Sequence, residues 1–288
     1  MNTALSVSKT VVVVLCTGLA FIPILLWGGH FLSKYRASRK WIIITFIGGA
    51  LAVAPLLIYK YLWQFFPWIN AFVWTRSLNV DILGLSSFMM VPWAVVATFI
   101  FVGIIEEISK MFSVKLIDKH ILSNVDDAIV FSIVAALGFA FVENAIYFYN
   151  IVFLRGFENL LFPFVFRSLF STFAHVMFSG IFGYFYGVAH FANPMLKRTI
   201  RKNRHPILIF FHKHFHWKRS VMFHDEKILE GLVFASGLHA FFNIILEMEW
   251  TFMIIPFLVM GYAILDHLIK EKDNLKRYGK VIPVRTSS

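Results

Sequence analysis

The sequence is poor in charged residues and in cysteine. Charged residues make up 15% of the 288 residues and hydrophobic residues 59%. A water-soluble domain carries about 25% charged residues, so this chain cannot face water on all sides. Its one cysteine, Cys16, excludes an intrachain disulfide. Acidic residues are also few, 16 against 27 Lys and Arg, and the resulting net charge of +11 is compatible with either a nucleic-acid partner or a membrane surface.

Internal repeats, Pro- or Gly-rich linkers and a soluble domain are missing as well. No segment alternates between apolar and polar residues over about ten positions, as a membrane β-strand does. We therefore treat residues 1–288 as a single integral membrane domain, an all-α polytopic helix bundle.

The sequence consists mostly of long apolar runs. A membrane-spanning helix needs about 20 mainly apolar residues, and seven segments meet this requirement. The first resembles the apolar part of a signal peptide, but it lacks an Ala-x-Ala-like cleavage site, so we expect a retained helix. The predicted spans are 10–32, 41–62, 91–114, 128–150, 161–190, 228–247 and 250–269.

Successive loops between the predicted spans are alternately rich and poor in Lys and Arg. Because cytoplasmic loops carry an excess of these residues, the alternation predicts the N-terminus outside and the C-terminus in the cytoplasm. It also accounts for the net charge by topology and attraction to anionic lipid, without nucleic acid. Loops 33–40, 115–127 and 191–227 and the tail from Lys270 carry four, two, nine and six of them, whereas loops 63–87 and 151–160 carry one each and the turn Glu247–Glu249 none.

Several polar side chains lie inside the predicted spans, where ionisable groups are costly and usually face the bundle interior. The adjacent pair Glu106 and Glu107 lies four and three residues before Lys110, so either carboxylate can reach the ammonium. Neighbouring side chains on a helix point about 100° apart, and one cation cannot easily satisfy both. We expect one carboxylate paired with Lys110 and the other protonated or holding a water. The other polar residues are Glu143 and Asn144, Arg167 and His175, and His239 and Asn243.

Two histidines lie on faces of small residues, which pack closely against neighbouring helices. Both should therefore face protein, and we expect Glu106 or Glu107 near His175. Two non-catalytic roles are the alternatives for these polar residues. They could form hydrogen bonds between helices, and Lys110 could extend its side chain to the membrane interface. The two faces are Ser171, His175, Ser179, Gly183 and Gly187, and Gly231, Ala235, His239 and Asn243.

These polar groups form a recognisable series. Glu106-Glu107-x-x-Lys110, Phe139-x-x-x-Glu143-Asn144, His175 and His239-x-x-x-Asn243, in this order on four helices, resemble the PrsW family of intramembrane proteases over about residues 90–245. That family belongs with the type II CAAX prenyl proteases, whose motif typically ends in Arg one position later than Lys110. The resemblance implies a glutamate-dependent endopeptidase with the glutamate pair and His175 as core residues. In bacteria, family members are linked to cleavage of membrane-bound anti-sigma factors.

The resemblance and the residues together predict a mechanism. Peptide hydrolysis needs a water, a base and a donor for the oxyanion. We expect Glu106 or Glu107 to be the base, Lys110 to hold the other carboxylate, and His175 to donate to the oxyanion or the leaving amine. Glu143, His239 and Asn243 would orient the water and its surroundings. We expect no cofactor and no metal, a multi-pass protein of the cell membrane, and a membrane-protein substrate such as an anti-sigma factor.

Alternative functions differ in what they require. A zinc protease could use two histidines and a glutamate, but the chain has no His-Glu-x-x-His, and Lys110 would oppose a dication. A non-catalytic scaffold, like the seven-helix subunit of γ-secretase, would not need the intact Glu-Glu-x-x-Lys. A transporter would show inverted repeats and broken helices.

The histidines of the basic loop 191–227 could bind metal, although histidines in a basic loop are more often simply solvated. These histidines are His205, His212, His214, His216 and His224. The chain has no Gly-x-Ser-x-Gly elbow, and Cys16 lies in span one, which disfavours covalent catalysis.

The predicted boundaries place two carboxylates at different depths. Glu106 falls about 16 residues from the outer end of its span, and Glu143 about 15 from the inner end of the next, at 1.5 Å per residue. With these boundaries the two groups meet only if the helices tilt, shift or break.

Overall fold

The structure is a computed structural model that describes residues 9–33, 38–69, 93–191 and 219–278. These residues form helices and no strand, which confirms the predicted all-α architecture. The helices are α1 (Lys9–Leu32), α2 (Arg39–Leu51), α3 (Ala54–Phe65), α5 (Trp93–Ile121), α6 (Val125–Arg155), α7 (Leu161–Phe166), the π-helix η3 (Arg167–Ser171), α8 (Thr172–Phe191), α11 (Arg219–Glu247) and α12 (Thr251–Tyr278), with short 3-10 turns at Pro67–Ile69 and Phe157–Asn159.

Six helical stretches in the described residues are long and apolar enough to cross a membrane, so the chain is a multi-pass membrane protein. Helix α5 has the length, 29 residues, but its middle carries Glu106, Glu107 and Lys110. The seventh span and the direction of insertion therefore stay predictions. The six stretches are Lys9–Leu32, Arg39–Phe65, Val125–Arg155, Phe157–Phe191, His224–Glu247 and Thr251–Lys270.

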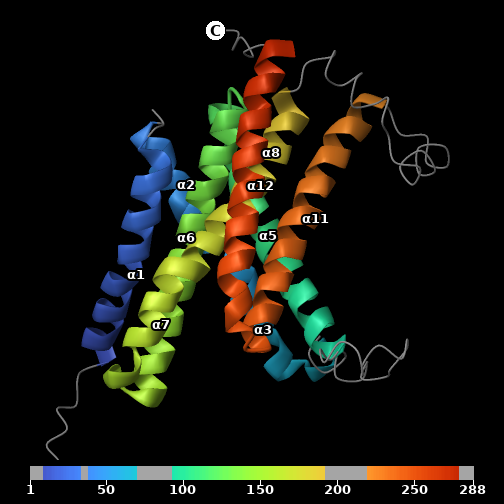
Figure 1. The fold of residues 1–288 in the computed structure, drawn as a ribbon. Coiled ribbons are helices and arrows are strands. Elements are labelled where there is room, and N and C mark those ends of the chain that lie inside the picture. The colour runs from blue at the N-terminus through green and yellow to red at the C-terminus, as the bar shows by residue number, and fades with distance from the viewer. Residues whose placement is uncertain (1–8, 34–37, 70–92, 192–218, 279–288) are drawn as a thin grey trace, which may run out of the picture.

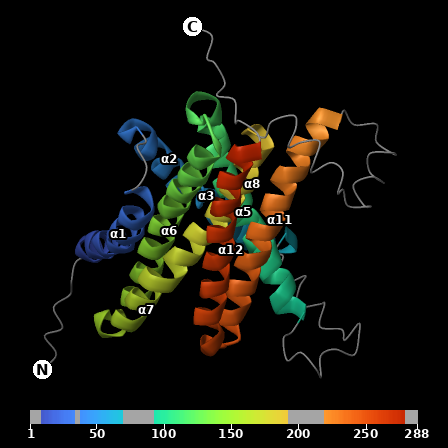
Figure 2. The same cartoon turned by 45° about the horizontal axis from the view of Figure 1, so that its top comes forward.

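Helix α6 runs through the middle of the bundle, between α1 and α2 on one flank and α8, α5 and α11 on the other (Figure 1). Turning the molecule shows the same order (Figure 2). Within its most apolar stretch, α6 is 72% buried and α1 22%, although their mean hydropathies are 2.1 and 2.5. Hydropathy thus identifies both helices as spans, but it does not tell which one is surrounded by protein.

Small residues explain the close approach of the central helices. A Cβ atom built on Gly183 of α8 would lie 2.8 Å from the Ala128 carbonyl oxygen of α6. One built on Gly103 of α5 would lie 2.9 Å from the Ser236 carbonyl oxygen of α11. Backbone atoms cannot give way as side chains do, so these crossings need glycine. The small-residue face predicted on span five is the surface that packs on α6.

Several boundaries differ from the prediction for local reasons. The span predicted at 41–62 is divided between α2 and α3, because Pro55 lacks an N–H and its ring clashes with the preceding turn. Helix α6 continues to Arg155, where Gly156 ends it with φ +86°. Helix α11 begins at Arg219, so the predicted loop 191–227 is helical at its end. His205, His212, His214 and His216 lie outside the described residues.

Candidate active site

Six of the seven residues predicted for the site meet where α5, α6, α8 and α11 come together. Glu106, Glu107 and Lys110 lie on α5, and each is at most 5% exposed. The carboxylate of Glu106 and the rings of His175 and His239 offer atoms within 4.8 Å of one another. The predicted proximity of His175 to the glutamate pair is therefore observed. The full set is Glu106, Glu107, Lys110, Glu143, His175 and His239.

Glu107 is held on both oxygens. Its Oε1 accepts from Lys110 Nζ at 2.5 Å and from His239 Nδ1 at 2.8 Å. Its Oε2 accepts a longer bond of 3.5 Å from the Ser179 hydroxyl. Lys110 is 2% exposed and lies over the Phe139 ring at 4.8 Å. Lys110 therefore does not extend to the interface, and it neutralises Glu107 inside the bundle.

Glu106 has a different environment. Its Oε2 is buried and has no hydrogen-bond partner among the described residues, although His239 Nε2 lies 3.4 Å away. Because a carboxylate oxygen only accepts, His239 must donate to Glu107 through Nδ1, and a neutral imidazole then has a lone pair on Nε2. That lone pair faces the Glu106 oxygen. Two facing acceptors of this kind can take up a proton or another cation between them.

His175 lies between an acid and a base. Its Nε2 is 2.8 Å from Glu143 Oε2, and its Nδ1 is 3.4 Å from Lys110 Nζ. Since an ammonium only donates, Nδ1 is the accepting nitrogen and Nε2 carries the proton. The two contacts fix both the tautomer and the orientation of the ring.

Arg167 completes the Glu143 side of the cluster. Its Nη2 lies 2.8 Å from Glu143 Oε2, and its Nε donates to Asn144 Oδ1 at 2.7 Å. The Asn144 amide in turn donates to the Thr172 hydroxyl at 3.0 Å. Sequence reasoning placed Arg167 inside a span but assigned it no role. The signal that could have found it is a basic residue at membrane depth, because such a residue usually pairs with a buried acid.

A π-helical turn positions Arg167. In η3 the backbone makes i→i+5 bonds, and the Thr172 hydroxyl also donates to the Arg167 carbonyl at 2.9 Å. Trp27 of α1 donates to the Ser168 carbonyl at 2.8 Å. Side chains thus satisfy carbonyls of a turn that departs from α-helical geometry. Such turns are frequent at functional sites, and the hydrophobic pattern of the sequence does not reveal this one.

The sequence left open whether Glu143 lies at the depth of Glu106, and the structure brings both carboxylates to His175. Glu106 lies thirteen residues after Trp93, the first residue of α5, and Glu143 twelve residues before Arg155, the last of α6. These two ends lie on the same side of the bundle (Figure 1). The C-terminal end of α6, longer than predicted, brings Glu143 level with Glu106, so Glu143 belongs to the cluster.

Asn243 is the predicted site residue that stands apart. It lies one turn beyond His239 on α11, its side chain makes no hydrogen bond within the described part of the chain, and it lines an adjoining pocket.

Comparison with known families agrees with the geometry. The sequence profile described as PrsW family intramembrane metalloprotease matches residues 37–266. The chain belongs to the PrsW family. It is accordingly an intramembrane protease, and the match extends beyond the predicted core of about 90–245 at both ends. No curated protein and no solved structure matches the chain.

The description of the PrsW family names a metal, and the cluster contains side chains that fit one. Glu106, His175 and His239 offer a ligand atom each, and two histidines with a glutamate are the ligands of several catalytic zinc sites. The Glu107 contact to His239 Nδ1 is of the kind that orients a zinc-bound histidine. His175, in contrast, has both ring nitrogens engaged by Lys110 and Glu143. The metal-free site expected from the sequence stays a prediction.

Proposed function

We propose that this PrsW family protease hydrolyses peptide bonds of membrane-associated proteins with a water activated by Glu106. The observation that carries the proposal is the contrast within the glutamate pair. Glu107 accepts from Lys110, His239 and Ser179, whereas Glu106 Oε2 has no hydrogen-bond partner among the described residues. A carboxylate with a free oxygen in a buried cluster can take a proton from water, and a fully engaged one cannot do so as readily.

The chemical step needs one proton to move twice. Glu106 removes a proton from water, and the hydroxide oxygen adds to the carbonyl carbon of the substrate. The proton is shared with His239 Nε2, 3.4 Å from Glu106 Oε2, and passes to the leaving amine when the carbon–nitrogen bond breaks. Transfer of this proton to the amine returns Glu106 to the unprotonated carboxylate of the starting state.

The other residues of the cluster position Glu106 and His239. Glu107 fixes the His239 tautomer through Nδ1. Lys110 neutralises Glu107 and supplies positive charge near the carbonyl oxygen as it becomes an oxyanion. His175 donates to Glu143 through Nε2 and accepts from Lys110 through Nδ1, so it helps to hold the Lys110 ammonium in position.

A second candidate is hydrolysis with a metal ion held by Glu106, His175 and His239, which the 4.8 Å grouping of their ligand atoms favours. When bound, such an ion would make a water acidic and polarise the substrate carbonyl. Glu107 would then keep its contact with His239, and His175 would have to give up Lys110 or Glu143.

One experiment separates the candidates. The chain is co-expressed with a library of tagged single-pass membrane proteins, and fragments lost in Glu106→Gln identify substrates. Purified protein is then assayed with a strong chelator. Under glutamate catalysis the chelator leaves cleavage unchanged. Chelator-sensitive cleavage that zinc restores would replace that mechanism by the metal-dependent one. Cleavage that survives in both Glu106→Gln and Glu107→Gln would remove the assignment of the pair.

The topology and the substrates are part of the proposal. We infer from the Lys and Arg distribution that the N-terminus is outside and that loop 191–227 and the C-terminus are in the cytoplasm. A reporter fused after Lys197 that is active only outside would reverse this orientation. The substrates would include membrane-bound regulators such as anti-sigma factors, in the cell membrane, as the resemblance implies.

A further inference from the structure

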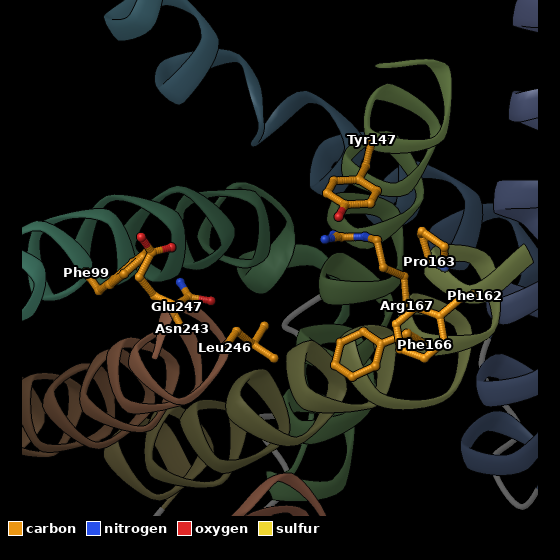
Figure 3. Close-up of a pocket in the computed structure, with 9 residues that line it drawn as sticks. All are labelled: Phe99, Tyr147, Phe162, Pro163, Phe166, Arg167, Asn243, Leu246 and Glu247. Carbon is orange, nitrogen blue, oxygen red and sulfur yellow. The ribbon is translucent and has the colours of Figure 1, made fainter. Parts of the chain in front are cut away.

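A pocket of about 370 Å³ lies beside the cluster. Figure 3 shows it between two walls, one from α6, α7 and η3 and the other from α5 and α11. Phe162 at its rim is 77% exposed, so the pocket is reachable from the surroundings of the bundle. The first wall is Tyr147, Phe162, Pro163, Phe166 and Arg167, and the second is Phe99, Asn243, Leu246 and Glu247.

The pocket continues the faces that form the cluster. Tyr147 lies four residues after Glu143 on α6, and Asn243 four residues after His239 on α11. Residues four apart share one face of a helix. Arg167 belongs to both regions, since it lines the pocket and contacts Glu143 at 2.8 Å. A chain segment bound in the pocket therefore leads directly to the proposed catalytic residues.

Two donors in the pocket suit peptide carbonyls. Arg167 Nη2 is buried and outside hydrogen-bonding geometry with every acceptor of the described residues, despite its short distance to Glu143. The Asn243 amide has no hydrogen bond in the described residues either. Stacking of the Arg167 guanidinium on Tyr147, 4.5 Å from the ring centre, fixes its plane. A substrate unwound for cleavage exposes carbonyls that the membrane cannot satisfy, and these donors can.

Most of the other lining groups are aromatic or aliphatic, and Glu247 is the charged exception on the α11 wall. Phe99, Phe166 and Leu246 have no polar side-chain atom and surround a space within the range of ligand pockets, about 300–1,000 Å³. We propose that the pocket is a substrate subsite that takes one large apolar side chain next to the scissile bond, while Arg167 and Asn243 bind the adjoining carbonyls. The subsite rests on the proposed function, and it adds a preference for Leu, Phe or a similar residue.

The test changes the size of the pocket in both directions. The probe is a tagged single-pass protein from the co-expression screen, with each residue from four before to four after the cleaved bond replaced singly by Ala, Leu, Phe and Trp. Phe166→Ala enlarges the pocket and should raise cleavage of the Trp probe relative to Leu at one position by about tenfold. Leu246→Phe fills the pocket and should shift the preference toward Ala at that position by a similar factor.

Matched controls use side chains of α7 and α11 that do not line the pocket. Val165→Ala and Val233→Phe change 42% and 63% exposed residues of the same region and of α11, and both should leave the preference unchanged. Asn243→Leu should raise KM for all probes about three- to tenfold without changing side-chain preference, as expected for one lost hydrogen bond. Where Phe166→Ala does not accumulate, Phe166→Leu serves as the milder variant.

The outcomes separate the two proposals. Opposite shifts at one probe position support the subsite. Glu106-dependent cleavage with the same preference in wild type, Phe166 variants and Leu246→Phe overturns the subsite and leaves the proposed function standing. Absence of any Glu106-dependent cleavage in wild type overturns the proposed function and the subsite with it.

Discussion

Glu106 and Glu107 are adjacent in the sequence and both buried, yet their carboxylates have different surroundings on the two sides of His239. Glu107 points to Lys110, His239 and Ser179, which satisfy both of its oxygens. Glu106 points to the His239–His175 side, where one of its oxygens has no hydrogen-bond partner among the described residues. Two neighbouring positions on α5 therefore have different roles. Glu107 holds the site together, and Glu106 is free to react.

The largest expected effect is loss of activity in Glu106→Gln. The amide keeps the shape but cannot accept a proton, so cleavage should fall by about 10²–10⁴-fold. Since the Glu106 oxygen has no partner to lose, the melting temperature in detergent should stay close to that of wild type. The yield of substrate fragments measures cleavage, and thermal unfolding in detergent measures stability. A variant that unfolds readily would show that Glu106, too, is structural.

Glu107→Gln should act on stability first. It leaves the Lys110 ammonium buried without a carboxylate, a change that costs about 3–5 kcal/mol, and the protein should unfold at a lower temperature or fail to accumulate. Glu107→Gln/Lys110→Met removes both charges and should recover most of the stability without restoring cleavage. A single variant as stable as wild type would contradict the structural role of Glu107.

Gly103→Ala tests how the α5–α11 contact aligns Glu106 with His239. The added Cβ would lie 2.9 Å from the Ser236 carbonyl, and forcing the helices apart should cost about 1–3 kcal/mol and reduce cleavage. Gly237→Ala is the control, because nothing lies within 4 Å of its Cβ position. Equal melting temperatures and activities for both variants would rule out this contact as the aligning element.

Ser179→Ala is expected to have the smallest effect. Its hydroxyl contacts Glu107 Oε2 at 3.5 Å, a long hydrogen bond, and Lys110 and His239 still hold the carboxylate. Unfolding should change by about 1 kcal/mol or less, and cleavage should stay near the wild-type rate. A large loss of activity would mean that this oxygen of Glu107 takes part in the reaction.

Much of the bundle follows from the sequence, because apolar length and small-residue spacing are local signals. The first predicted span, 10–32, agrees closely with α1, Lys9–Leu32. The faces carrying His175 and His239 were predicted to point inward, and both histidines are buried. Four-residue spacing is enough for this, since it depends on helix geometry alone.

Other features were not predicted, and most of them depend on contacts between distant segments. The depth of Glu143 depends on where α6 ends, and the apolar residues 151–154 before Gly156 were the overlooked sign that it continues to Arg155. The partner of Arg167 is set by the π-turn, whose carbonyls are satisfied by Thr172 and Trp27. Which of two adjacent glutamates Lys110 selects is decided by helix crossing, because both are within its reach on an isolated helix.

The π-turn at Arg167–Ser171 also sets the rotation of α8 relative to α7 about the helix axis. A π-helical turn contains one residue more than an α-helical turn, and one residue corresponds to about 100° of rotation. Deleting a single residue such as Leu169, which is 42% exposed, would let α7 and α8 join as one regular helix. The joined helix would no longer present Phe166 to the pocket and His175 to the cluster at the same time. One inserted residue therefore sets the relative rotation of substrate pocket and catalytic centre.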